Sequence, residues 1–155
     1  MVFINKVENI IIHISDSTWG SASEIRKWHL EKGWADIGYH FVILNGQIRP
    51  DFCLATLDGS FEIGRHLDGD MFIEDNEVGA HALGYNDKSI GICGIGKVGW
   101  TAIQKDSLII LLIELTEYFK IPKSNVLGHC ETESGKAQGK TCPNLNMDVI
   151  RNNLR

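Results

Sequence analysis

The sequence of 155 residues has no long apolar run, no excess of basic residues and only three prolines. No stretch approaches the ~20 apolar residues of a membrane-spanning helix, so we expect no membrane insertion. Fifteen Lys and Arg against twenty Asp and Glu give a net charge of −5. This balance disfavours a nucleic-acid partner, because phosphate backbones are bound by clustered basic side chains. The segment from Met1 to Asn9 lacks the apolar core of a secretory signal, so we expect the chain to be cytoplasmic as synthesised.

Cysteine is too sparse to suggest a disulfide framework. The 155 residues, 43% of them apolar, suffice for one hydrophobic core without covalent staples, and dense disulfides are a feature of small exported domains. The length is that of a single domain. The four thiols are therefore available as core residues, metal ligands or nucleophiles, at Cys53, Cys93, Cys130 and Cys142.

Apolar patterning predicts alternating strands and helices. Strands are expected at 9–15, 39–44, 61–64, 89–93 and 126–127, and helices at 22–32, 101–120 and 147–154. Ser21 with Glu24 and Thr101 with Gln104 form capping-box patterns that mark two helix starts. Strands that alternate with helices predict one α/β domain, with a central mixed sheet of about five strands flanked by helices.

The connections are less regular. Asn45-Gly46 predicts a hairpin turn that joins the strand at 39–44 to the residues 47–49. Most of the segment 50–79 and the polar segment 128–143 are expected to be loops.

Two histidines and a cysteine stand near strand ends and are candidates for a metal site. His13 lies in the first apolar strand, His129 follows the strand at 126–127, and Cys142 comes after a polar loop. Imidazole nitrogen and thiolate sulfur are ligands that zinc prefers, and three protein ligands leave a fourth position for water. The spacing matches no local zinc motif, so for His13 a buried core histidine remains the alternative.

Two other kinds of chemistry are open to the chain. Residues 94–99 spell GxGxxG after a strand, but a dinucleotide fold would place an acidic residue at the end of the next strand. A glycine-rich loop is the better interpretation. A thiol nucleophile is also possible, with Cys142 or Cys130 beside His129. The side chains of neighbouring residues in an extended segment point in opposite directions. This disfavours Cys130 as a nucleophile activated by His129, and also as a third metal ligand beside His129.

The other histidines are expected to be structural or solvated. His40 should face the side of its strand opposite to Tyr39 and is expected to be structural. His29 on a helix and His66 in a loop are expected to be solvated.

Six blocks resemble, in this order, the zinc-dependent N-acetylmuramoyl-L-alanine amidases of the phage T7 lysozyme type, which are related to the peptidoglycan recognition proteins. The blocks are 28–34 with 37–41, 64–65, 79–86, 89–92, 126–129 and 140–143. The resemblance spans about Ile10 to Ile150. Two segments, 50–60 and 131–139, are extra relative to compact members, and the second must still deliver Lys140 and Cys142 to the site.

The resemblance implies three kinds of site residue. These are the zinc ligands His13, His129 and Cys142, the catalytic residues Tyr39 and Lys140, and the substrate-binding residues His81 and Asn86. One zinc ion per chain would activate water, and the hydroxyl of Tyr39 and the ammonium of Lys140 would stabilise a tetrahedral oxyanion.

The implied activity is hydrolysis of the amide between N-acetylmuramic acid and L-alanine in peptidoglycan. We expect one amidase domain over 1–155 with no separate wall-binding module, in a monomeric endolysin or prophage-derived relative. A holin would release it to act on the cell wall. The alternatives are a recognition protein that binds peptidoglycan without cleaving it, and a cytoplasmic amidase that recycles muropeptides.

Overall fold

The computed structural model describes residues 5–155. The expectation that the segment 1–9 is not an export signal therefore lies partly outside the described residues. The strands are β1 Asn5–Lys6, β2 Asn9–Ile14, β3 Phe41–Ile43, β4 Gln47–Arg49, β5 Phe52–Cys53, β6 Phe61–Ile63, β7 Phe72–Ile73, β8 Ser89–Gly94 and β9 Val126–Gly128. The helices are α1 Ala22–Glu31, α2 Ala102–Phe119, α3 Glu133–Ala137 and α4 Met147–Asn152. No helix in this part of the chain combines the length and hydrophobicity needed to cross a membrane.

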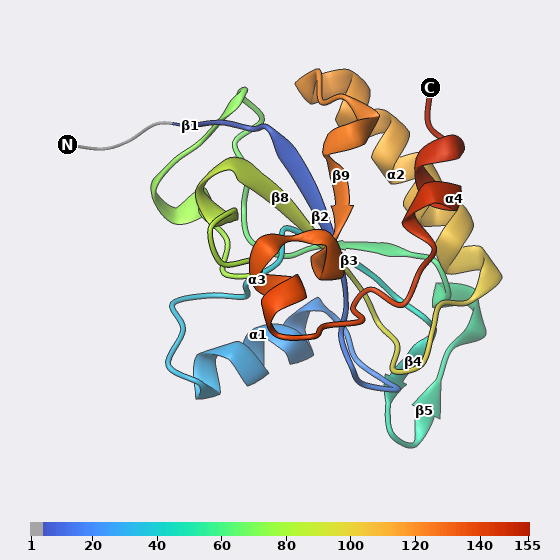
Figure 1. Cartoon of the computed structure of the whole chain (residues 1–155). Coiled ribbons are helices and arrows are strands. Elements are labelled where there is room, and N and C mark those ends of the chain that lie inside the picture. The colour runs from blue at the N-terminus through green and yellow to red at the C-terminus, as the bar shows by residue number, and fades with distance from the viewer. Residues whose placement is uncertain (1–4) are drawn as a thin grey trace.

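Five strands form the central sheet, in the order β6-β3-β8-β2-β9 (Figure 1). β2 lies in the middle of the parallel part and pairs with β8 over its whole length and with β9 over three residues. The edge strand β6 is antiparallel to β3. The prediction of one α/β domain with a mixed sheet of about five strands is confirmed.

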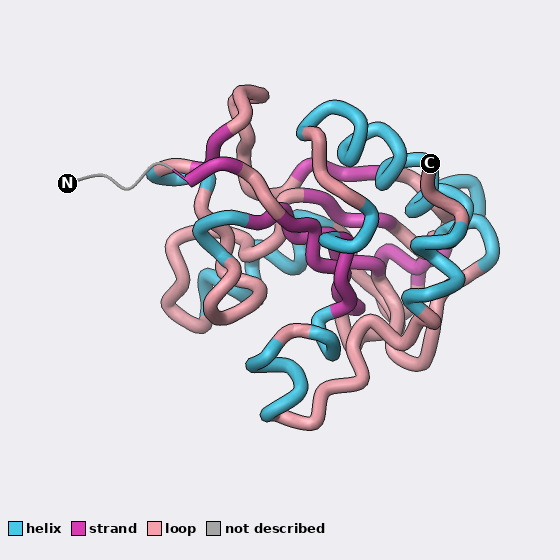
Figure 2. Tube along the Cα trace, turned by 45° about the horizontal axis from the view of Figure 1, so that its top comes forward, coloured by secondary structure: helices cyan, strands magenta, loops and turns pink. Residues whose placement is uncertain are grey.

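Two apolar clusters cover the two faces of the sheet. Ile10 and Ile12 of β2 join the larger cluster, in which α2 and α4 pack on one face. Ile25 of α1 belongs to the smaller cluster, which also contains Val42 of β3. Figure 2 shows the helices on both sides of the strands. Because side chains alternate along a strand, His13 points to the face opposite to Ile10 and Ile12.

The predicted helix starts are confirmed. The side chain of Ser21 accepts a hydrogen bond from the backbone N–H of Glu24, and Thr101 with Gln104 forms a full capping box. The side chain of Gln104 also donates to the carbonyl oxygen of Ile43 at 3.1 Å. The start of α2 is thereby tied to β3.

The predicted hairpin at Asn45-Gly46 is wrong. β4 pairs with β5 and not with β3. Both edges of β3 are already taken, by β6 and β8, so no edge is left for a hairpin partner. The dipeptide still turns the chain, because Asn45 Oδ1 accepts the N–H of Gln47 at 3.0 Å and Gly46 adopts a φ of +89°.

The segment 128–143 is only partly loop, because α3 lies within it. The hydroxyl of Thr132 caps α3 by accepting the N–H of Gly135 at 3.1 Å, and it donates to the carbonyl oxygen of His129 at 2.7 Å. A Cβ at Gly135 would lie 1.9 Å from that same oxygen. Only glycine therefore allows α3 to pack this closely against the end of β9.

Candidate metal centre

The three predicted ligands converge at the carboxyl ends of two parallel strands. His13 is near the end of β2, His129 follows β9, and Cys142 lies on the segment after α3. One potential ligand atom from each of these side chains lies within 4.8 Å of the other two. The rings of His13 and His129 have centroids 4.7 Å apart. The carboxyl edge of a parallel sheet is the usual place for a binding site in this fold class.

The chemistry of the three side chains suits a zinc ion. Burial lowers the pKa of His13 well below its usual value and also lowers that of His129, with Lys140 acting in the same direction. Both imidazoles are therefore neutral and able to coordinate. Burial raises the pKa of the Cys142 thiol to about 11, although the N–H of Ile14 donates to its sulfur at 3.2 Å. Two neutral imidazoles and a thiol that ionises on metal binding form a donor set that fits zinc.

A second histidine contacts His13. Nε2 of His13 is 2.9 Å from Nδ1 of His81, and the two rings meet edge to face. Nε2 of His81 lies 3.2 Å from the hydroxyl of Ser89. Among the described residues, His81 does not belong to the group of three converging ligands. Its predicted role in substrate binding is not decided by this contact.

The end of β9 is fixed by ionic and backbone contacts. The carboxylate of Glu131 accepts the N–H of Gly128 at 2.9 Å and forms two hydrogen bonds with Arg151 of α4, at 2.8 and 3.0 Å. Arg151 also donates to the carbonyl oxygen of Val126. These contacts bracket His129, so the extra segment 131–139 is part of the support of the site.

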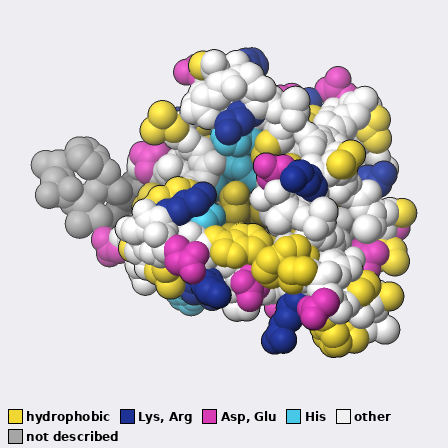
Figure 3. All heavy atoms as spheres, turned by 90° about the horizontal axis from the view of Figure 1, so that it is seen from below, with side chains coloured by type: hydrophobic (Ala, Val, Ile, Leu, Met, Phe, Trp, Pro, Cys, Tyr) yellow, Lys and Arg dark blue, Asp and Glu magenta, His cyan; other side chains and the backbone are white. Residues whose placement is uncertain are grey.

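An open cleft of about 840 Å³ contains the converging ligands. Its lining includes all seven residues predicted for the site: His13, Tyr39, His81, Asn86, His129, Lys140 and Cys142. Figure 3 shows histidine side chains exposed in a hollow of this face, with basic side chains nearby. The structure therefore brings the whole predicted set to one place, while leaving the individual roles as predictions.

Tyr39 and Lys140 come from different segments: Tyr39 lies just before β3, and Lys140 follows α3. The ring of Tyr39 lies 5.1 Å from that of His13, centroid to centroid. Burial raises the pKa of Tyr39 well above its usual value, and the neighbouring thiols of Cys93 and Cys142 add to this shift. Its hydroxyl therefore remains a proton donor. Lys140 is exposed on the segment between α3 and Cys142 and supplies positive charge to the cleft.

Asn86 shapes the wall of the cleft. Its Oδ1 accepts the backbone N–H groups of His81 and Ala82, both at 2.8 Å. One side-chain oxygen thus holds the turn that presents His81. Its predicted contact with substrate remains a prediction.

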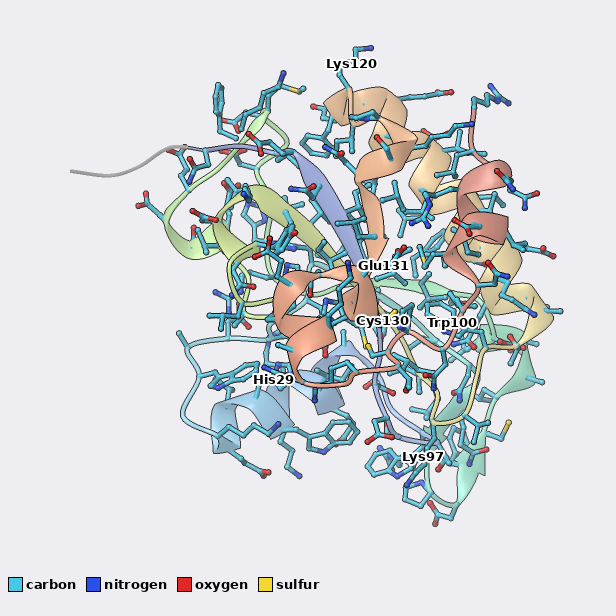
Figure 4. The ribbon with its side chains drawn as sticks, viewed as in Figure 1. His29, Lys97, Trp100, Lys120, Cys130 and Glu131 are labelled. Atoms are coloured by element: carbon cyan, nitrogen blue, oxygen red, sulfur yellow. The ribbon has the colours of Figure 1, made fainter. Side chains whose placement is uncertain are left out.

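The remaining histidines and thiols lie outside the group of three converging side chains. The expectation that His29 is solvated is wrong: it is 7% exposed and accepts the N–H of Gly38 at 2.9 Å, because the chain after α1 folds back over it (Figure 4). His40 is buried, as expected for a structural residue, and His66 is exposed, as expected. Cys130, which Figure 4 labels close to Glu131, lies outside the converging group. All four cysteines are free thiols.

Sequence reasoning missed several residues of the site. Ser89, Thr132 and Gly135 support ligands, and Lys97, from the glycine-rich segment 94–99, lines the cleft. Figure 4 places Lys97 and Trp100 on the segment after β8. Residues 94–99 could have been recognised as part of the site because they follow a strand, and the carboxyl ends of parallel strands lie at the edge where sites form.

The fold and the site define a class of protein: a single α/β domain in which three side chains able to bind a metal converge at the carboxyl edge of the sheet, in an open cleft. The family model described as N-acetylmuramoyl-L-alanine amidase matches residues 4–145. The chain belongs to this family.

Phage endolysins are among its relatives. The endolysin of Escherichia phage T7 is 38% identical over 100 residues, which cover 59% of this chain and 53% of that protein. The endolysin of Enterobacteria phage K11 is 32% identical over 132 residues, covering 80% of this chain and 70% of that protein. The chain thus spans about half the length of the T7 endolysin.

Solved structures share the fold. Wild-type Drosophila PGRP-LB is 26% identical, with a TM-score of 0.62 over 92% of this chain and 79% of that chain. The N-acetylmuramoyl-L-alanine amidase LysC from Clostridium intestinale has a TM-score of 0.67 over 97% of this chain and 88% of that chain. At 23% identity the second comparison shows the fold alone.

Proposed function

We propose that this chain is a zinc-dependent amidase that hydrolyses the bond between N-acetylmuramic acid and L-alanine in peptidoglycan. The observation that carries the proposal is the convergence of His13, His129 and Cys142 in a cleft that Tyr39 and Lys140 also line. Membership of the amidase family and the similarity to phage endolysins support the same reaction.

His13, His129 and Cys142 would hold the zinc ion. When bound, zinc supplies Lewis acidity to the amide carbonyl and to water. The chain's own residues then have separate tasks. The hydroxyl of Tyr39, kept protonated by burial, donates a hydrogen bond to the oxygen that gains charge as the carbonyl is attacked. The ammonium of Lys140, which also lines the cleft, stabilises the same charge, and donors of this kind each contribute a factor of about 10²–10³ in rate.

The cleft supports a muropeptide as the substrate. A volume of about 840 Å³ is sufficient for a sugar with several stem residues, and the cleft is open enough for a polymer to enter. His81 and Asn86 on its wall are proposed to contact this substrate. The solved structure of a mutant of Drosophila PGRP-LB, 25% identical to this chain, is a complex with tracheal cytotoxin, which supports this class of ligand.

We also propose how the protein is organised and where it acts. We propose that residues 1–155 form one amidase domain. The protein would act as a monomer on the cell wall after synthesis in the cytoplasm, with a holin as the means of release. The phage endolysins among its relatives support this setting.

Purified sacculi test the reaction directly. The metal-loaded protein should lower the turbidity of the suspension and release new amino groups of L-alanyl peptides. A chelator should stop both, and added zinc should restore them. If metal-loaded protein binds sacculi but releases no amines, the amidase is ruled out in favour of a recognition protein. Activity confined to soluble muropeptides would indicate a recycling enzyme.

A further inference from the structure

A continuous chain of polar contacts runs from the metal centre into the domain. It starts at Nε2 of His13, which is 2.9 Å from Nδ1 of His81. Nε2 of His81 lies 3.2 Å from Oγ of Ser89, and that hydroxyl lies 2.7 Å from the carbonyl oxygen of Tyr85. None of the steps needs a charged group, and three successive side chains are involved.

The last contact of this series, at the carbonyl oxygen of Tyr85, determines the direction of every hydrogen bond in it. The carbonyl oxygen of Tyr85 can only accept, so Ser89 uses its single hydroxyl proton to donate to it. Ser89 must then accept from His81, which places the proton of the neutral His81 ring on Nε2. Nδ1 of His81 is left with a lone pair and accepts from His13. His13 therefore carries its proton on Nε2, and its Nδ1 lone pair is free for a metal ion.

The His81 ring is held in a fitted cradle. A Cβ at Gly91 of β8 would lie 2.7 Å from two atoms of this ring, and a Cβ at Gly79 would also lie 2.7 Å from it. Real Cβ atoms do not approach so closely, so both positions must lack a side chain for the ring to lie here. Asn86 fixes the backbone of His81, because its side-chain oxygen accepts the backbone N–H of His81. The contact with His13 is thus built from several independent elements.

We infer that His81 is a positioning residue, which acts through His13 by fixing the tautomer and ring orientation of that metal ligand. The inference rests on the metal site of the proposed function and adds Ser89 as the group that fixes His81 in turn. Partners of this kind usually change metal affinity by about 10- to 100-fold when removed. A contact between His81 and substrate is not needed for this role.

Metal affinity in the full chain, measured by competition with a chelating dye, separates positioning from other roles. His81→Phe keeps an aromatic ring but removes the acceptor, and we expect zinc affinity to fall about 10- to 100-fold. His81→Asn places an amide oxygen where Nδ1 was and should recover much of this loss. Ser89→Ala should cost less than His81→Phe, because the His81 ring remains and only its tautomer is freed.

His29→Phe is the matched control. His29 is also a largely buried histidine near the cleft that accepts one backbone N–H, from Gly38 at 2.9 Å, but it is not one of the converging ligands. Its loss should affect stability in a similar way and leave zinc affinity unchanged. If His81→Phe fails to fold, the zinc affinities of Ser89→Ala and His81→Asn can still be compared with that of His29→Phe. The inference predicts a loss of affinity in Ser89→Ala and none in His29→Phe.

Spectroscopy gives a readout that a packing role would not change. In ¹⁵N spectra of the wild type, His13 should show a protonated Nε2, and added Zn²⁺ should shift Nδ1 alone. The Co²⁺ form of His81→Phe should show an altered ligand-field spectrum. The inference is overturned if His81→Phe binds Zn²⁺ as tightly as the wild type, or if Nε2 of His13 proves to be the coordinating atom.

The outcomes for the two proposals are distinct. A wild-type chain that binds Zn²⁺ but releases no amines from sacculi would remove the amidase and leave the role of His81 intact. A His81→Phe variant with unchanged affinity and spectrum would remove the positioning role and leave the amidase intact.

Discussion

At the scale of single residues, burial sets the protonation states that the site requires. It lowers the pKa of His13 and His81 and raises the pKa of Tyr39. The imidazoles are therefore neutral and the phenol is protonated at neutral pH. A neutral imidazole can coordinate a metal, and a protonated phenol can donate to a developing negative charge, so the environment prepares both roles before any ligand binds.

Tyr39→Phe isolates the contribution of one hydroxyl. The substitution keeps the ring that packs 5.1 Å from His13 and removes the donor, so we expect kcat to fall about 10²–10³-fold with KM little changed. Rates of amine release from a soluble muropeptide provide the measurement, and zinc content of the variant should equal that of the wild type. A variant with wild-type kcat would show that the hydroxyl takes no part in the reaction.

The sequence was sufficient to name the three side chains that converge, but not the residues that contact them. Residue type and position near strand ends made His13, His129 and Cys142 candidates, and the resemblance to the amidase family singled them out. The contact of His13 with His81 depends on the pairing of β2 with β8, because Ser89 and Gly91 of β8 hold the His81 ring. Nothing local in the sequence reports such a pairing. The burial of His29 was missed for the same reason, since its partner Gly38 lies beyond the helix.

At the scale of elements, β9, α3 and α4 form one support for His129. Arg151 of α4 joins Glu131 through two hydrogen bonds, and their side chains are 18% and 30% exposed. The pair is neither fully buried nor free in water. It links the C-terminal helix to the end of the strand that carries a ligand.

Arg151→Ala tests this support. The change leaves the Glu131 carboxylate without its main partner, and we expect a loss of about 1–3 kcal/mol in the free energy of unfolding, between the values for exposed and buried pairs. Urea denaturation measures it. Arg155→Ala is the matched control, because its pair with Glu117 is 80% and 56% exposed at 3.7 Å and should contribute nothing measurable. Equal losses in both variants would contradict a specific role for Arg151.

Gly135→Ala tests the packing of α3. A Cβ would lie 1.9 Å from the carbonyl oxygen of His129, so α3 must move away and disturb the ligand. We expect lower stability and weaker zinc binding, measured by denaturation and by chelator competition. Gly99→Ala is the control, since a Cβ there meets nothing within 4 Å. Zinc affinity unchanged in Gly135→Ala would mean that α3 does not position His129.

Elements with a strong local signal were predictable, and those defined by partners were not. α2 was predicted because the capping box at Thr101 and Gln104 is followed by apolar residues at helical spacing from Leu108 to Phe119. The hairpin at Asn45-Gly46 failed because its turn chemistry is local, whereas the edge of β3 was already occupied by β6. α3 was missed because its five residues are held by Thr132 and His129 and show no apolar periodicity.

At the scale of the whole molecule, the site exists only when the domain is folded. Its ligands come from β2, from the end of β9 and from the segment after α3, and the histidines around them are neutral in the folded state. In the unfolded chain the same histidines would have ordinary pKa values near 6.5. Folding and protonation are therefore linked through the entire domain.

His40 shows the sign of this linkage. Burial lowers its pKa to about 4. Its Nε2–H donates to the carbonyl oxygen of Glu77 at 2.6 Å, and its Nδ1 accepts the N–H of Gly91 at 3.0 Å. A proton on Nδ1 would take away the acceptor of Gly91. Burial also lowers the pKa of His29 to about 4, so the unfolded chain binds protons between pH 6.5 and 4 that the folded protein does not.

The free energy of unfolding of the metal-free protein should therefore be greatest above pH 6.5 and fall as the pH drops towards 4. A single buried histidine contributes a slope of up to about 1.4 kcal/mol per pH unit in this window. Urea denaturation at several pH values with chelator present measures the slope. His40→Gln should reduce this slope by the contribution of one histidine. An identical slope in His40→Gln and wild type would show that His40 takes up its proton in the folded state, and the linkage argument would fail for this residue.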